Sequence, residues 1–354
     1  MHAGDSSVVC SHRSGELVAR TGVPLADAYL EFLGGRCRPN TVRAAAYDLK
    51  VFFTVVGRPP DQVRPADVLA FITAQRTGRG GEHGALQPVQ ARVEPGGVSA
   101  ATVRRRLSIV SGFFGFLQAR GDVAANPVPR GLPTRRERSR PGQGVPLVRA
   151  ARRLPRILAP AEVDALTAGL FTHRDRAMVA AMVLGGLRRC EVLGLRMGDL
   201  HVAERRVFIA EGKGGRQRLI PVSGRFFAAV AAYLDAERPP GAATDRVFVV
   251  LKGPRRGQPL SAKGVEVVLA GARRRAGLDH GTCHELRHTC LTRLREAGMA
   301  LEAVQAQAGH ASIESTRIYL HLADDWLAAQ YRKAAEVIDA QVFAGQPAAS
   351  GRQR

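Results

Sequence analysis

Apolar residues recur at helical spacing through the first third of the chain. The clearest run covers residues 99–117, where apolar side chains fall three or four positions apart and line one face of an amphipathic helix. Ser99 stands at the start of this run, where its hydroxyl can accept a hydrogen bond from a backbone amide of the first turn. Weaker runs of the same spacing predict helices that begin near Pro24, Asn40 and Pro65.

The remainder of the chain mixes helical spacing with short β-like runs. A glycine-rich turn at residues 211–216 joins two of these runs and indicates a hairpin. The sequence therefore predicts a mainly α fold with a small antiparallel sheet (α+β). The expected strands are 207–210, 218–222 and 247–250. The expected helices are 160–169, 174–185, 188–195, 263–276, 284–297, 301–308, 312–318 and 324–339.

Proline, glycine and arginine are frequent in residues 127–155, which separate the two helical regions. Prolines at this density favour an extended and basic linker. Residues 77–97 are rich in glycine and lack periodicity, so we expect a loop there. The predicted organisation is a flexible tail over 1–20, a helical domain over 21–126, the linker over 127–155, a second domain over 156–342 and a flexible tail over 343–354.

Basic residues outnumber acidic ones by 52 to 31, which gives a net charge of +21. A surplus of this size predicts attraction to polyanions, with nucleic acid as the leading candidate. Only five of the 52 basic residues are lysines, as a GC-rich genome would favour. Codon usage explains the preference for arginine, but it does not explain the deficit of acidic residues.

The sequence carries no signal for a membrane or for secretion. No stretch approaches the roughly 20 apolar residues of a membrane span, and the N-terminus lacks the charged and apolar regions of a signal peptide. The five cysteines are odd in number and include no C-x-x-C pair, which favours a reducing compartment. We therefore expect a cytoplasmic protein, associated with the nucleoid of a bacterium.

Histidines and arginines that could hold a phosphate gather in the second half of the chain. His284, Arg287 and His288 are three and four positions apart, which places them on one face of a predicted helix. Positive charge concentrated in this way is costly unless an anion binds there. Further candidates stand at Arg188, Glu191, His310 and Tyr319.

At these positions the sequence resembles the tyrosine recombinases of the phage-integrase family. Gly186-Leu-Arg188-Arg-Cys-Glu191-Val-Leu resembles the family's first arginine box, G-L-R-x-x-E-L, and Gly212-Lys213-Gly-Gly-Arg-Gln-Arg-Leu-Ile-Pro221-Val resembles its lysine-bearing hairpin. His284-Glu-Leu-Arg287-His288-Thr resembles the box H-x-L-R-H-T, and the segment from Ala308 to His321 resembles L-G-H-x-S-x-x-x-T-x-x-Y-x-H. Order and spacing agree in all four, and with the helical N-terminal part the resemblance covers about residues 20–340.

The resemblance implies a helical core-binding domain that contacts DNA, followed by a tyrosine-recombinase catalytic domain. It implies that the phenol of Tyr319 attacks a DNA phosphorus, which makes a 3′-phosphotyrosyl link and frees a 5′-hydroxyl. Arg188 and Arg287 would bind the two non-bridging oxygens of that phosphate. Lys213 would protonate the departing 5′-oxygen.

Histidines and one carboxylate complete the implied site. His284 would assist proton transfer at the tyrosine, and His310 would donate to a phosphate oxygen. Glu191 and His288 would orient these groups from behind without touching the substrate.

The implied partner is double-stranded DNA that carries specific recombination sites. The implied assembly on DNA is a homo-tetramer, and a monomer in the absence of DNA is compatible with it. The bond energy is kept in the protein–DNA ester, so no cofactor and no metal ion is expected. The residues do not reveal the target DNA sequence, the accessory factors, or whether the reaction is integration, excision, resolution or transposition. Contacts to DNA are expected from the basic residues Arg43, Lys50, Arg104, Arg105, Arg106 and Arg216.

Other functions fit parts of the same pattern. A type IB topoisomerase shares the chemistry but requires neither two specific sites nor a synaptic complex. The run His284-Glu-Leu-Arg-His288 also fits the zinc-hydrolase motif H-E-x-x-H, although Leu291 and Leu294 occupy the places where the extended motif has glycine and histidine. A DNA-binding module without activity is the third alternative, although all six catalytic-type residues are present.

The resemblance leaves two points of packing open. Ala308 stands where the family usually has leucine, so the packing behind His310 is not defined by the motif. The last predicted helix carries an apolar stripe, which could pack on its own chain or on a neighbouring protomer.

Overall fold

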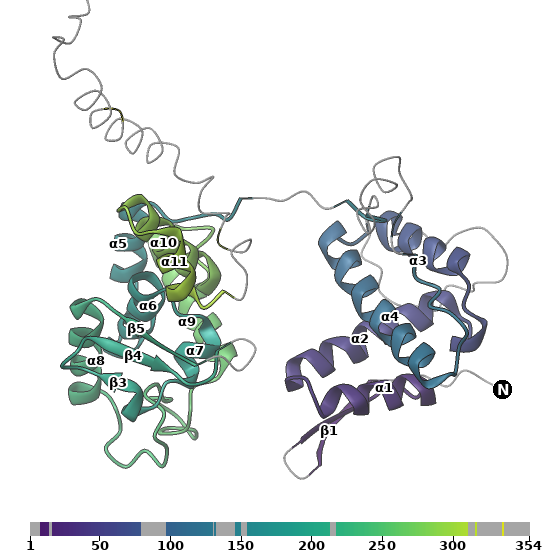
Figure 1. Ribbon diagram of the computed structural model, residues 1–354. Helices are drawn as coiled ribbons and strands as arrows, with labels where there is room; N and C mark the ends of the chain where they lie inside the picture. Colours follow the sequence, from purple (N-terminus) through teal and green to yellow (C-terminus); the bar gives the residue numbers. More distant parts are fainter. Residues whose placement is uncertain are drawn as a thin grey trace, which may run out of the picture. The chain divides into compact units, whose positions relative to one another are not determined.

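The computed structural model describes residues 8–13, 16–78, 97–129, 131, 146–149, 154–212, 217–310, 316 and 335. The chain divides into two compact units, Met1–Arg152 and Arg153–Arg354 (Figure 1). Each unit has its own apolar core. The division falls inside the segment that the sequence predicts as a linker. The helices expected at 312–318 and 324–339 lie almost entirely outside the described residues.

In the described part of the first unit, helices tend to begin at prolines and end at glycines. A proline at the first helical position has a suitable φ and lacks an amide that would need a partner. Gly57, Gly78 and Gly121 close their helices in the left-handed conformation, with φ of 64°, 70° and 85°. The helices are α1 (Pro24–Gly34), α2 (Pro39–Val56), α3 (Pro65–Thr77) and α4 (Ala100–Arg120), with the short 3-10 turn η1 (Pro60–Gln62) between α2 and α3.

The start of α4 confirms the predicted cap. Ser99 is extended, and its Oγ accepts a hydrogen bond from the amide of Thr102 at 3.2 Å. The hydroxyl thus satisfies one of the amides that have no partner within the first turn.

Aromatic side chains from α2, α3 and α4 form the centre of the first core. Phe52, Phe71, Phe113 and Phe114 are fully buried. The ring centroids of Phe52 and Phe71 lie 5.1 Å apart in an edge-to-face arrangement, and those of Phe113 and Phe114 lie 5.0 Å apart. Burying one such side chain stabilises a fold by about 1.5–3 kcal/mol, so this cluster holds the three helices together.

In place of the flexible tail predicted over 1–20, the described residues of this segment form a β-hairpin. β1 (Val9–Arg13) pairs antiparallel with β2 (Glu16–Arg20), and β2 packs against α1 and α2 (Figure 1). Ala19 is buried, and the amide and hydroxyl of Thr21 donate to Asp27 Oδ1 at 2.6 and 2.9 Å. A short hairpin is not stable alone, and its contacts with α1 and α2 are not visible in the local pattern.

The second unit combines helices with a small sheet, and the predicted mainly α fold with a small antiparallel sheet is confirmed. The sheet order is β3-β4-β5, with Val207 opposite Ile220 and Phe208 opposite Leu219. The strands are β3 (Leu200–His201), β4 (Arg206–Ile209) and β5 (Arg218–Pro221). The helices are α5 (Pro160–Ala168), α6 (His173–Gly185), α7 (Arg189–Gly194), α8 (Gly224–Ala236), α9 (Ala262–Ala276), α10 (Cys283–Glu296) and α11 (Leu301–Ala308), with the 3-10 turn η2 (Met197–Asp199).

One helix and one strand differ from the sequence prediction. α8 is absent from the predicted elements, although Phe226, Val230 and Tyr233 have helical spacing. The strand predicted at 247–250 is wrong, because that segment takes its hydrogen bonds from outside the sheet. Tyr233 Oη donates to Val247 O at 3.1 Å and accepts from the amide of Val249 at 3.3 Å. Backbone groups of Leu195, Gln258 and Leu260 bond to the same segment, which forms only an isolated bridge between Val249 and Pro259.

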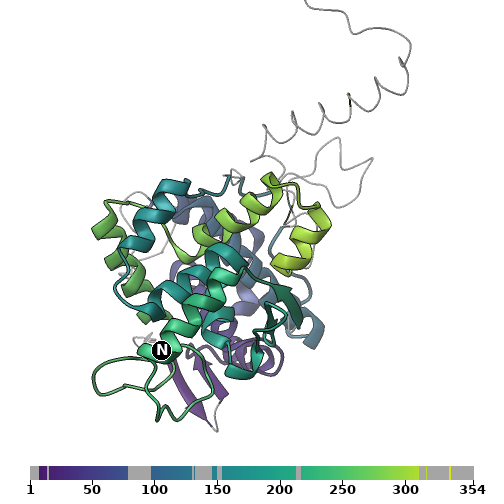
Figure 2. The same ribbon diagram turned by 90° about the vertical axis from the view of Figure 1, so that its left-hand side faces the viewer.

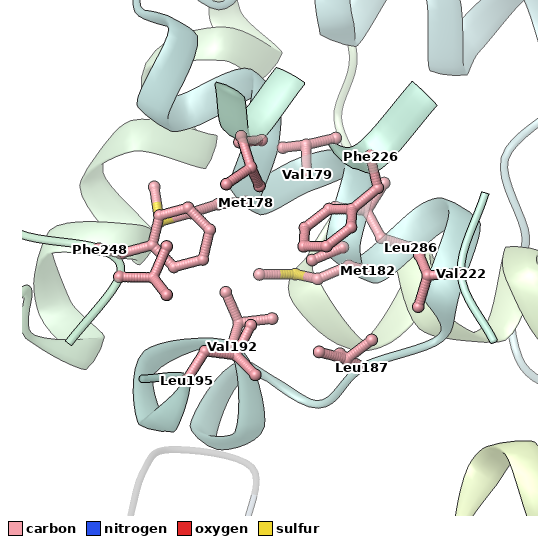
Figure 3. Packing of buried hydrophobic residues seen from close by; sticks show 14 of the residues in the cluster. Met178, Val179, Met182, Leu187, Val192, Leu195, Val222, Phe226, Phe248 and Leu286 are labelled. Atoms are coloured by element: carbon pink, nitrogen blue, oxygen red, sulfur yellow. The ribbon is translucent and has the colours of Figure 1, made fainter. Parts of the chain in front are cut away.

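The core of the second unit is built around α6, which packs against both α8 and α10 (Figure 2). Met178 and Met182 on α6 lie in one cluster with Phe226 of α8 and Leu286 of α10 (Figure 3). Within the part of the chain that the structure describes, no helix has both the length and the apolar character needed to cross a membrane.

Two of the predicted site residues are flanked by residues of this core. Leu187 and Val192 are fully buried and stand on either side of Arg188 (Figure 3). Leu286 is fully buried and directly precedes Arg287. The core therefore fixes the backbone from which each of these arginine side chains extends.

We expect that replacing Phe226 by alanine will lower the free energy of unfolding of the second unit by about 3–5 kcal/mol, because a large cavity forms between α6 and α8. Val202→Ala is the control, since Val202 is 63% exposed and surface changes stay within about 0.5 kcal/mol. Urea unfolding, followed by hydrogen exchange of α6 and α8, measures both. Equal losses for the two variants would contradict this description of the core.

Candidate functional site

Four segments of the second unit meet at the C-terminal end of α11. They are the connection from α6 to α7, the first residue of β5, the first turns of α10, and the turn after α11. The last carbonyls of a helix have no partner within it and carry the negative end of the helix dipole. Here three consecutive carbonyls each accept from an arginine: Gln307 O from Arg218, Ala308 O from Arg287 and Gly309 O from Arg188.

Arg188 is the residue at which the chain enters α7. Gly186 ends α6 with a φ of +68°, which favours glycine, and Arg188 is extended. The amide of Arg188 donates to Glu191 Oε2 at 2.9 Å and its Nη1 donates to Oε1 at 2.7 Å, so one carboxylate holds both the backbone and the side chain. Nη2 donates to Gly309 O at 3.2 Å. The side chain remains 19% exposed, which allows approach from solvent.

Glu191 is the buried anion of the site, with no exposed side-chain surface. Arg218 donates to it twice, at 3.0 and 2.9 Å, and Nη1 of Arg287 lies 3.9 Å from Oε2. Burial by itself raises the pKa of this carboxyl, but the hydrogen bonds from Arg218 and Arg188 outweigh it and hold the pKa below its ordinary value. Glu191 is therefore ionised at neutral pH.

Arg287 is the most deeply buried of the three arginines, at 2% exposed. Its Nη1 donates to Gly186 O, and its Nη2 donates to Ala308 O at 2.6 Å and lies 3.2 Å from His310 Nε2. These contacts join the end of α6 to the end of α11 through one side chain. Its described partners are thus mainly neutral backbone carbonyls, with the Glu191 carboxylate 3.9 Å away.

The first turn of α10 is closed by a capping box. Thr282 Oγ1 accepts from the amide of Glu285, and Glu285 Oε2 accepts from the amides of Gly281 and Thr282 at 2.8 and 2.7 Å. This arrangement counts against the zinc-hydrolase alternative, because the glutamate of H-E-x-x-H is held by backbone amides and is not directed towards a metal-bound water. No group of three or more possible metal ligands is found among the described residues.

The histidines lie on α10 and directly after α11. The rings of His284 and His288 pack edge to face with their centroids 4.3 Å apart. His284 is exposed, whereas His288 is buried beneath it. His310 follows Gly309, and its Nδ1 lies 3.0 Å from Oγ1 of the buried Thr316. This contact fixes the orientation of the His310 ring.

All three histidines are neutral at neutral pH. Burial, followed by the charges of neighbouring side chains, lowers the pKa of His288 and the pKa of His310 to about 4 in each case. Partial burial and the charges of Arg287 and Arg188 also lower the pKa of His284. Among the described residues of the site, the positive charge therefore comes from the arginines.

The structure thus brings together Arg188, Glu191, Arg287 and His310, with His284 and His288 on the adjacent turn of α10. Tyr319, Lys213 and Arg216 lie outside the described residues.

The basic residues predicted to bind DNA differ in their surroundings within the first unit. Arg104 is exposed on α4, and Arg43 is exposed on α2 beside Asn40. Arg105 forms a two-bond ion pair with Asp48, and Arg106 bonds to Gln75 and lies 3.6 Å from Asp48. Arg106 is therefore part of the internal packing between α2, α3 and α4. Lys50 is half-buried on α2.

Arg218, Gln307 and Thr316 belong to the site but are absent from the predicted set. One signal for Arg218 exists, since it stands two residues before the buried Ile220 on a strand and so shares its inward face. An inward arginine requires a buried carboxylate. Gln307 has no comparable signal, because its amide donates to Gly185 O and Pro221 O at 3.0 and 3.1 Å, which are contacts of the folded chain.

Comparison with known proteins identifies the family. The phage integrase family model matches residues 156–325, which contain all of these side chains. Tyrosine recombinase XerC of Xylella fastidiosa (strain 9a5c) is 34% identical over 251 residues, which cover 70% of this chain and 78% of XerC. The chain belongs to the phage integrase family of tyrosine recombinases. It is therefore an enzyme of DNA recombination, from a family that cleaves and rejoins DNA strands.

Other relatives agree with this assignment. Tyrosine recombinase XerD of Lacticaseibacillus casei is 33% identical to this tyrosine recombinase over 242 residues, 66% of this chain and 76% of XerD. The fold is similar to that of the XerH site-specific recombinase bound to its palindromic difH substrate. That similarity has a TM-score of 0.61 and 17% identity, over 90% of this chain and 86% of XerH.

We expect the imidazoles of His288 and His310 to titrate near pH 4 in the DNA-free protein, as their lowered pKa values require. The unfolded chain takes up these protons near its ordinary pKa of about 6.5. The free energy of unfolding should therefore fall as pH decreases from about 6.5 to about 4, and these two groups should add no further loss below that. Imidazole resonances and urea unfolding at each pH measure the effect, and His310→Gln should remove part of it. Titration of both rings near pH 6.5 would contradict the buried arrangement.

Proposed function

We propose that this tyrosine recombinase acts at specific sites on duplex DNA through a 3′-phosphotyrosyl intermediate, with Tyr319 as the nucleophile. One observation carries the proposal. Nη2 of Arg188 and Nη2 of Arg287 donate to the adjacent carbonyls of Gly309 and Ala308, so the two guanidiniums lie side by side. His310 follows at once and Tyr319 comes nine residues later in the sequence.

The arginine pair suits a phosphate that gains charge during the reaction. A guanidinium keeps its proton at any working pH and presents donors that match two phosphate oxygens. In the proposed transition state, Arg188 and Arg287 neutralise the two non-bridging oxygens. Loss of one such fixed donor costs on the order of 3 kcal/mol or more in the barrier, by analogy with oxyanion sites.

The proposed proton transfers use the remaining side chains. The phenol oxygen of Tyr319 forms a bond to phosphorus while the bond from phosphorus to the 5′-oxygen breaks. The phenol proton passes to His284. Burial and Arg287 keep the pKa of His284 below the usual range, so its imidazole is neutral and has a ring nitrogen that can accept a proton. Lys213 gives a proton to the departing 5′-oxygen, and His310 donates to a non-bridging oxygen.

Strand exchange is the reverse of cleavage with a different 5′-hydroxyl. That hydroxyl attacks the phosphotyrosyl phosphorus, the tyrosine is released, and its proton returns. The number of phosphodiester-type bonds is conserved in each step, so the proposed cycle requires neither a nucleotide cofactor nor a metal ion.

The proposed assembly is a homo-tetramer that holds two duplex sites. The net charge of +21 supports a DNA partner, as does the DNA substrate in the related XerH structure. A topoisomerase-like enzyme would instead relax one supercoiled duplex without a second site. Recombinant products from two differently labelled duplexes would support the recombinase, and relaxation alone would overturn it.

We expect wild-type protein to form a covalent adduct with a nicked duplex from which the short 5′-hydroxyl fragment escapes after cleavage. Tyr319→Phe should form none, because it lacks the attacking oxygen. Denaturing gels of labelled duplex detect the adduct, and peptide mapping locates it. Tyr331→Phe is the matched control and should react as wild type does. An adduct in Tyr319→Phe would overturn the assignment of the nucleophile.

We expect Arg104→Ala and Arg106→Ala to act differently in the first unit. Arg104 is exposed, so its loss should weaken DNA binding and reduce the salt dependence by about one charge. Arg106 contacts Gln75 and the buried Asp48, so its loss should lower the free energy of unfolding by about 1–3 kcal/mol. Fluorescence anisotropy at several salt concentrations and urea unfolding measure the two effects. An equal change in salt dependence without loss of stability would contradict the internal role of Arg106.

A further inference from the structure

Arg218 occupies a position in the site that the proposed reaction leaves without a role. It is the first residue of β5 and comes five residues after Lys213 in the sequence. Its side chain is 12% exposed, and each of its three guanidinium nitrogens has a protein acceptor. A side chain held in this way cannot turn towards a substrate without giving up a charged partner.

Arg218 affects how the negative charge of Glu191 is shared among the neighbouring arginines. The buried carboxylate accepts two hydrogen bonds from Arg218 and one from the Arg188 side chain, and it lies 3.9 Å from Arg287. A single carboxylate thus faces three guanidiniums. Arg218 supplies two of these three side-chain hydrogen bonds, so less of the Glu191 charge is set against Arg188 and Arg287. Without Arg218, the carboxylate would be compensated by those two arginines instead.

The turn that carries His310 is shaped by the same side chain. Arg218 Nε donates to Gln307 O at 3.3 Å. Gly309 has a φ of +59°, and a Cβ at this position would lie 2.8 Å from Arg218 Nη1 and 2.9 Å from its Cζ. The guanidinium therefore lies directly against the Gly309 backbone, whose carbonyl accepts from Arg188. Arg218 supports the phosphate-binding pair both through Glu191 and through this turn.

We infer that Arg218 is a positioning residue, which compensates Glu191 and holds the Gly309 turn so that Arg188 and Arg287 direct their charge at the scissile phosphate. The inference rests on the proposed function. It assigns Arg218 to the arginine pair, and not to the protonation of the leaving group by the lysine on the same hairpin.

The primary measurement is the single-turnover rate of covalent adduct formation, together with DNA affinity. Arg218→Met should slow adduct formation by about tenfold to a hundredfold, as for other groups that orient a charged ligand from behind. DNA affinity should change by less than about threefold, as expected for a residue that acts on the transition state. Arg218→Lys keeps the positive charge but loses the paired donors of the guanidinium, so it should form the adduct faster than Arg218→Met and more slowly than wild type. Arg225→Met removes an exposed arginine of the same unit and should leave the rate unchanged.

Modified substrates separate positioning from a general loss of structure. A methylphosphonate at the scissile position lacks one charged oxygen, so the Arg218→Met defect should shrink on this substrate. A 5′-bridging phosphorothiolate needs no proton on its leaving group, and the defect should persist there. Full recovery on the phosphorothiolate would assign Arg218 to the lysine hairpin and overturn the inference. An equal defect on all three substrates would also overturn it, because it would indicate only a structural role.

Two further variants keep the test independent of folding. Adding Glu191→Gln to Arg218→Met removes the carboxylate charge that Arg188 and Arg287 would otherwise have to compensate, so the double variant should react faster than Arg218→Met alone. Gly309→Ala displaces the Arg218 guanidinium without removing it, and should show the same substrate pattern. If the wild type forms no adduct, the proposed function fails. If the wild type reacts and the Arg218 variants react equally well, only this inference fails.

Discussion

A single buried carboxylate determines the arrangement of the site. Glu191 caps α7 through the Arg188 amide and binds the side chains of Arg188 and Arg218, and it lies beside Arg287. Three guanidiniums could not be placed this close together without an anion, because each one desolvated alone would cost several kcal/mol. The carboxylate makes the cluster possible, and among the described residues it is the anion that the three guanidiniums share. In the proposed reaction the scissile phosphate supplies further negative charge to Arg188 and Arg287.

The elements that position this cluster could be predicted from local sequence, because their signals lie within a few residues. Thr282 marks the start of α10 with a side chain that accepts a backbone hydrogen bond, and Glu285 completes the capping box three residues later. The box around Arg188 and the box around Arg287 each have an arginine beside a core leucine, so the motif also encodes the packing that orients it. The resemblance to a family therefore located Arg188, Glu191, Arg287 and His310, which the structure brings together.

The parts that sequence did not predict depend on contacts between distant segments. Arg218 contacts Glu191 and Gln307, which are 27 and 89 residues away, and no local period records such a partner. The run 247–250 divides its backbone hydrogen bonds among Tyr233, Leu195 and residues 257–260, so it forms an isolated bridge and no strand. Three adjacent arginines on α4 look alike in sequence, but Arg105 and Arg106 both contact Asp48 on α2 and only Arg106 is largely buried there. In each case a buried polar partner outweighs the local pattern.

In the proposed reaction, proton donation by His310 depends on the bound phosphate, because the ring is neutral and the arginines around it are charged. His310 has a pKa of about 4 because burial and three arginines disfavour its cation. A phosphate bound about 4 Å from the ring would favour that cation by about 4 kcal/mol at an effective dielectric constant of 20, which corresponds to about three pKa units. The pKa would then lie near neutrality, where an imidazole can donate or accept a proton with little driving force. On this argument the proposed donor becomes competent only when a phosphate is bound, so the same arginines that bind the substrate suppress proton transfer in its absence.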